Sequence, residues 1–206
     1  TGEARATPDV AMTSFTVLRS AKTAREALDA ANAAMREVTS GMRALGIADR
    51  DLQTSGFSIN PQYRYDNQND GTQKPPEIVA YEVRNSLTVR VRDIGKLGEI
   101  LDRAVTLGVN QGGEISFDVA EPQEARNAAR QEAVSDAMAT AKVLAEAAGV
   151  TLGPVREISE SGSQMPPQPM GRSMKMMAAE AAPSVPVETG ENSFNASVRM
   201  VFSIAD

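Results

Sequence analysis

Three helical segments of this sequence end at a glycine, and each glycine is followed by a β-branched residue and a strand-like segment. The junctions are Leu45-Gly46-Ile47, Leu107-Gly108-Val109 and Ala148-Gly149-Val150. Glycine commonly ends a helix because it adopts the left-handed conformation without steric cost. These glycine stops predict a fold in which helices and strands alternate along the chain. It is compatible with a repeated α–β unit, but glycine stops are common, so internal duplication stays open.

Apolar residues at spacings of three and four mark the helices. The first runs from Ala24 to Leu45, and Thr23 with Glu26 fits a capping box at its start. A second helix, with Asp93 as its expected cap, ends at Gly108. The third is rich in alanine, and its larger expected anchors are Val134, Met138 and Leu144.

The strand segments alternate apolar and polar residues, with Pro61 suggesting an edge or a bulge and Gly153-Pro154 an interruption. Half-buried alternation favours antiparallel pairing over a doubly wound parallel sheet. We therefore predict an α+β fold: mixed, largely antiparallel sheets with long helices packed on one face. The predicted strands are residues 9–19, 57–65, 78–92, 115–119, 150–159 and 194–204.

The length of 206 residues suits one domain, which could consist of two α/β subdomains at about residues 1–92 and 93–206. Residues 161–188 are rich in Met, Pro, Ser and Ala and show neither period, so we expect a mobile loop there. Residues 66–76 are polar and predict a shorter loop.

The amino-acid types that are absent from the sequence exclude several classes of function. The chain has no Cys, His or Trp, which excludes disulfides, thiolate nucleophiles, a Ser-His-Asp triad and His-ligated metals or haem. A formal net charge of -6 argues against nucleic acid as a partner. No apolar run is long enough to predict a membrane span, and the start at Thr1-Gly2-Glu3 suggests signal removal or trimming.

For several motifs, a structural role explains the residues better than a functional role does. The glycines of residues 108–113 follow a helix and precede a strand, so they predict a turn and not a phosphate loop. The paired acids Asp49 with Asp51, Glu121 with Glu124 and Glu157 with Glu160 are expected on a solvated surface. We predict no catalytic residue, cofactor or metal.

Candidate interaction residues form three groups. Arg84, Arg90 and Arg92 share one strand face, which is either a charged outer face or a site for an anionic ligand or neighbouring subunit. Aromatic contacts are expected around Tyr63, Tyr65 and Tyr81. Half of the ten methionines cluster in one segment, where thioethers could hold Cu(I), oxidise or bind a partner, or could be incidental: Met165, Met170, Met174, Met176 and Met177.

Six segments together resemble the SIMPL-domain family, and within it the branch of periplasmic immunogenic proteins of Gram-negative bacteria. The similarity covers nearly the whole chain, although none of the segments is a catalytic signature. They are Ala21–Ala27, Asp49–Thr54, Ser86–Arg92, Leu107–Gly113, Leu144–Val150 and Glu191–Ile204.

The resemblance implies a periplasmic or envelope-associated α/β protein without an established enzymatic activity. Through some members of the family, it also implies a link to oxidative-stress tolerance and assembly into large hollow homo-oligomers. Our leading hypothesis is a non-enzymatic envelope protein that self-assembles. The alternative is a binding module for a small envelope ligand or soft metal through the Met-rich loop, and an enzyme using carboxylates and tyrosines ranks last.

Overall fold

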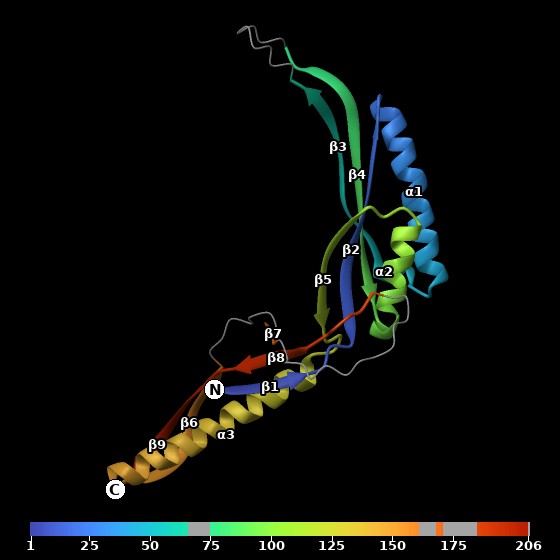
Figure 1. Ribbon diagram of the computed structural model, residues 1–206. Coiled ribbons are helices and arrows are strands. Elements are labelled where there is room, and N and C mark those ends of the chain that lie inside the picture. The colour runs from blue at the N-terminus through green and yellow to red at the C-terminus, as the bar shows by residue number, and fades with distance from the viewer. Residues whose placement is uncertain (66–74, 161–167, 171–184, 206) are drawn as a thin grey trace. The chain divides into compact units, whose positions relative to one another are not determined.

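The computed structural model describes residues 1–65, 75–160, 168–170 and 185–205 (Figure 1). These residues form three α-helices and nine β-strands in antiparallel pairs, which confirms the α+β class. The chain divides into two compact units. The described part of the inserted unit is residues 10–65, 75–116 and 185–187, and that of the terminal unit is residues 1–9, 117–160, 168–170 and 188–205.

The inserted unit has a four-stranded sheet in the order β3-β4-β2-β5. Because β2 and β3 both pair antiparallel with β4, they run parallel to each other, and α1 is the crossover between them. The element order β-α-β-β-α-β is that of the ferredoxin-like motif. Its elements are β2 (Val10–Ala21), α1 (Ala24–Ala44), η1 (Asp49–Asp51), β3 (Leu52–Arg64), β4 (Glu77–Val91), η2 (Ile94–Lys96), α2 (Leu97–Thr106) and β5 (Gln111–Asp118).

Helix α1 begins and ends as its sequence predicts. The Glu26 backbone N–H donates to the Thr23 hydroxyl and the Thr23 N–H donates to the Glu26 carboxylate, so the capping box is confirmed. Gly46 follows the helix with φ of 89°. Helix α1 packs on β2 and β4, with α2 beside it (Figure 1). The core between them includes Ala31, Val83 and other buried side chains: Phe15, Val17, Val38, Met42, Leu87, Val89 and Val91.

The terminal unit places one long helix against two small sheets. Helix α3 packs against β1, β8 and β9 (Figure 1). The sheets have the orders β1-β8-β7 and β6-β9. The elements are β1 (Gly2–Ala6), α3 (Gln123–Ala148), β6 (Thr151–Glu160), β7 (Gln168–Met170), β8 (Glu191–Ala196) and β9 (Val198–Ala205).

Small residues make the contact between β1 and α3. A Cβ atom added at Gly2 would overlap the backbone of Ala129 and Ala133. The prediction that larger residues anchor α3 is therefore wrong for two of them, because alanines face the sheet and let the backbones approach. Met138 and Leu144 are instead 50% and 64% exposed.

Two local predictions change in the structure. The predicted strand 194–204 is two strands, since β8 ends at Ala196 and β9 begins at Val198, and they join different sheets. Asp93 makes no side-chain cap, because a 3-10 turn precedes α2, and its carboxylate instead lies 3.7 Å from the Lys96 ammonium.

Pro61 does lie in an edge strand, as predicted. The methionine-rich segment is described only at residues 168–170 and 185–188, and its remainder lies outside the described residues.

Candidate functional site

An uncovered apolar stripe runs along one face of the edge strand β3. We define it as Phe57, Ile59 and Tyr63, whose exposed fractions are 55%, 39% and 47%. Ile59 pairs with Val83, which packs against α1, so the stripe lies on the face of the sheet that α1 covers elsewhere. Since β3 is an edge strand and α1 packs chiefly on β2 and β4, the three side chains of the stripe stay 39–55% exposed within the described residues of this unit.

The structure separates the three predicted tyrosines. The rings of Tyr63 and Tyr65 lie with centroids 6.4 Å apart and planes tilted by 45°, an arrangement within the range of paired aromatic rings. Both side chains are exposed. Tyr81 is partly buried against the cluster of Ala27, Ala31 and Val83, so it belongs to the core of the unit.

A buried carboxylate forms the centre of a second site, at the end of β4. Asp51 is 7% exposed, and both of its oxygens accept hydrogen bonds from Arg92. The Arg92 Nε lies 2.9 Å from Oδ2, and the second guanidinium nitrogen lies 2.8 Å from Oδ1. The expectation of a solvated acid pair is therefore wrong for Asp51, whereas Asp49 stays exposed and pairs with Arg43.

The Asp51 carboxylate borders a cavity of about 250 Å³, which we call the arginine pocket. Arg50 and Arg90 also line this pocket, and the Arg50 Nε lies 4.0 Å from the Asp51 carboxylate. The hydrogen bonds from Arg92 lower the pKa of Asp51, outweighing the effect of burial, and the charges of Arg92, Arg50 and Arg90 lower it further. Asp51 is thus held in its ionised form.

The structure brings together two of the three predicted arginines. Arg90 and Arg92 both line the arginine pocket. Arg84 lies farther along β4, paired with Leu18 of β2 and Ser58 of β3, and does not line it. Of the predicted methionines, Met170 lies in β7, opposite Glu191 of β8. The others lie outside the described residues: Met165, Met174, Met176 and Met177.

The terminal unit has an apolar groove between α3 and the β6-β9 sheet, with a volume of about 560 Å³. Leu144 and Ile204 line it and are both more than half exposed. Sequence reasoning missed this groove because it expected Leu144 to be a buried anchor. An exposed apolar surface of this kind commonly marks an interaction site.

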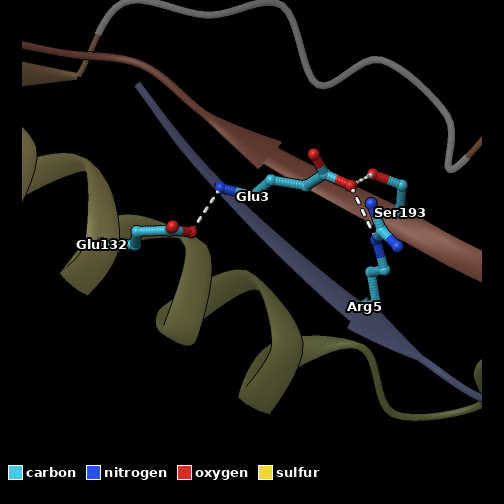
Figure 2. Close-up of polar contacts among 4 residues, drawn as sticks. All are labelled: Glu3, Arg5, Glu132 and Ser193. Atoms are coloured by element: carbon cyan, nitrogen blue, oxygen red, sulfur yellow. Dashed lines mark hydrogen bonds and ion pairs between the residues drawn. The ribbon is translucent and has the colours of Figure 1, made fainter.

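Polar contacts fix β1 within the terminal unit (Figure 2). The Glu3 carboxylate accepts hydrogen bonds from Arg5 and Ser193, each at 3.0 Å, and the pKa of Glu3 is lowered by the bond from Arg5 and then by that from Ser193. The Glu3 backbone N–H donates to Glu132 of α3 at 2.7 Å. These contacts tie the first strand to both β8 and α3.

The pairing of Asp51 with Arg92 was not predicted from the sequence, because the two residues are 41 positions apart. A local signal was present, since Asp51 comes immediately before β3 and Arg92 immediately after β4, two strands that pair. Across the described ranges, no three acidic side chains gather as a metal site would require. None of the helices in the described part of the chain combines the length and apolar content needed to cross a membrane.

Residues 1–202 match the family named SIMPL, described as "Protein of unknown function (DUF541)". The chain belongs to the SIMPL family. This SIMPL protein is 50% identical, over 205 residues, to the 26 kDa periplasmic immunogenic protein of Brucella melitensis biotype 1, covering 98% of this chain and 82% of the relative. The protein of the same name from Brucella abortus strain S19 matches equally. The uncharacterized protein YggE of Escherichia coli K12 is 30% identical over 207 residues, covering 99% of this chain and 80% of the relative. These matches confirm the predicted family.

Proposed function

We propose that this SIMPL protein is a non-enzymatic periplasmic protein that assembles into a homo-oligomer through the β3 stripe. The uncovered stripe is the observation that carries the proposal. The segment from Leu52 to Tyr63 contains no charged side chain, whereas the exposed edges of monomeric proteins are usually protected by charges. A second copy of this chain would cover the three apolar side chains of the stripe.

The contact would rest mainly on side chains. Pro61 has no backbone N–H, and register shifts between Thr54 and Gly56 and between Gln62 and Tyr63 interrupt the regular ladder of β3. These features limit continuous strand addition at this edge. Burying one large apolar side chain contributes about 1.5–3 kcal/mol, so three such side chains supply a useful share of an association energy.

The groove of the terminal unit supports the same proposal with a separate surface. Two different apolar surfaces on one chain allow contacts that are not self-complementary, and such contacts generate rings when the rotation closes. Leu144 and Ile204 are the most exposed large side chains of that groove.

Sedimentation velocity and native mass measurement at micromolar concentration test the assembly. We expect species heavier than one chain for the wild type. Phe57→Glu should weaken association at least about thirtyfold, equivalent to about 2 kcal/mol. Val105→Glu is the matched control, because Val105 is 67% exposed on α2, away from the stripe. A strictly monomeric wild type, or equal weakening by both substitutions with both variants folded, would contradict the proposal.

The non-enzymatic part is supported by the state of Asp51. It is the only buried charged side chain in the described residues. Its two oxygens are occupied by Arg92 and its pKa is lowered, so it is not poised to exchange a proton near neutral pH. A hydrolase activity lost in Asp51→Asn, with folding intact, would contradict this part.

The periplasmic location is supported by the names of the two Brucella relatives, and the absence of Cys is compatible with an oxidising compartment. Fractionation of cells that express the natural gene tests the location. A link to oxidative-stress tolerance is supported only by the family resemblance. Equal peroxide survival of cells with and without the gene would contradict that link.

A further inference from the structure

The arginine pocket carries more positive charge than its own acids neutralise. Its charged lining residues are Arg50, Asp51, Arg90, Arg92, Asp93 and Lys96, four positive and two negative. Two pairs account for the acids: Arg92 binds Asp51, and Lys96 lies 3.7 Å from Asp93. The excess of two positive charges contrasts with a whole chain of net charge -6.

Arg90 and Arg50 supply this excess. The Nε atom of Arg90 is buried and has no hydrogen-bond partner in the described part of the chain. Buried polar groups are nearly always hydrogen-bonded, so a buried donor without a partner marks a place where an acceptor is expected. Arg50 reaches Asp51 only at 4.0 Å, beyond hydrogen-bond distance, and its side chain is 77% exposed.

We propose that the arginine pocket binds a phosphate group, either free phosphate or a small phosphomonoester, through Arg90 and Arg50. A phosphomonoester carries nearly two negative charges at neutral pH and offers three acceptor oxygens, which matches the excess charge and the available donors. Guanidinium groups bind phosphate with paired hydrogen bonds. The cavity of about 250 Å³ is below the range of drug-sized ligand sites, which favours a small anion over a nucleotide.

The structure also assigns distinct roles to the neighbouring charges. Arg92 binds both oxygens of the Asp51 carboxylate, which leaves Arg90 and Arg50 as the ligand-binding pair of the proposal. Asp51 lies close enough to Arg90 and Arg50 to feel their charges. Its charge attracts both guanidiniums but does not satisfy the buried Arg90 Nε–H.

The test is a titration of the full chain, followed through the arginine Nε–Hε signals in ¹H–¹⁵N NMR spectra. Inorganic phosphate and glycerol 3-phosphate are added in separate titrations, with acetate at equal ionic strength as the comparison. We expect a saturable shift of the Arg90 signal with at least one phosphate compound. A response to only one of them identifies the free anion or the monoester as the better ligand, and either response supports the site.

Two variants and one control locate the binding. Arg90→Gln and Arg50→Gln should each weaken phosphate binding about fivefold or more. Arg84→Gln should leave it unchanged, because Arg84 is on the same strand but does not line the pocket. Arg50 is mostly exposed, so its substitution keeps the test valid even if Arg90→Gln unfolds the chain. No saturable shift with either phosphate compound, equal binding of acetate, or equal weakening by Arg84→Gln would overturn the proposal.

Discussion

The Arg92 guanidinium occupies both carboxylate oxygens of Asp51, at 2.9 and 2.8 Å, and connects the turn before β3 to the residue after β4. Asp51 is buried, whereas the Arg92 side chain is 48% exposed. Solvent around Arg92 screens the pair, so its contribution is smaller than that of a fully buried ion pair.

Asp51→Asn should lower the free energy of unfolding by about 1–2 kcal/mol, because one oxygen of the pair becomes a donor facing Arg92. Urea denaturation measures this change. The matched control is Asp49→Asn, in the same turn, since the Asp49 side chain is 78% exposed and its pair with Arg43 lies in solvent. We expect a change below about 0.5 kcal/mol there. Equal effects of the two substitutions would be inconsistent with a structural role for Asp51.

The contribution of Asp51 should depend on pH. Hydrogen bonds from Arg92 lower its pKa in the folded protein below the usual carboxyl value. A lowered folded-state pKa contributes stability that is present above the unfolded-state pKa and is lost as pH falls through the folded-state pKa. The difference in unfolding free energy between wild type and Asp51→Asn should thus be constant near neutral pH and shrink below about pH 4. A difference that grows on acidification would refute this assignment.

Gly2→Ala should destabilise the terminal unit by about 2 kcal/mol or more, because the added Cβ overlaps the backbone of Ala129 and Ala133. Hydrogen exchange at the Glu3 amide should accelerate, since that N–H donates to Glu132. Gly112→Ala is the control, as a Cβ there meets nothing within 4 Å. Unchanged exchange at Glu3 in Gly2→Ala would show that β1 tolerates the extra atom.

Thr23→Ala should lower the stability of the inserted unit by about 1 kcal/mol, because the Glu26 N–H loses its acceptor. Thermal unfolding followed by circular dichroism measures the loss. Ser135→Ala, within α3, is the comparison, and we expect it to be neutral or slightly stabilising because alanine favours a helix interior. A neutral Thr23→Ala would mean that water replaces the cap.

Local patterns predicted the elements whose boundaries depend on neighbouring residues. The capping box of α1 and the three glycine stops follow from short segments, and Gly46, Gly108 and Gly149 all have positive φ. Alternation also identified β2 and β4 correctly. The α+β class follows from these elements together.

The remaining features depend on residues far apart in the sequence. The segment Gly2–Ala6 has no strong strand pattern, and it becomes β1 because it pairs with β8 and packs on the alanines of α3. The burial of Asp51 requires the pairing of β3 with β4. Tyr81 and Tyr63 lie on neighbouring strands, but only Tyr81 is covered by α1. The alternation of apolar and polar residues cannot predict this difference in burial.

The pairing of β1 with β8 constrains the order in which the chain can fold. Glu3 and Ser193, which share a hydrogen bond, are 190 positions apart. A chain that emerges from its amino end can complete β2 through β4, but β1 has no partner strand until almost the entire protein is available. We expect the first strand to remain exposed longest, which makes the terminal unit the last to form and the more dependent on protection during synthesis.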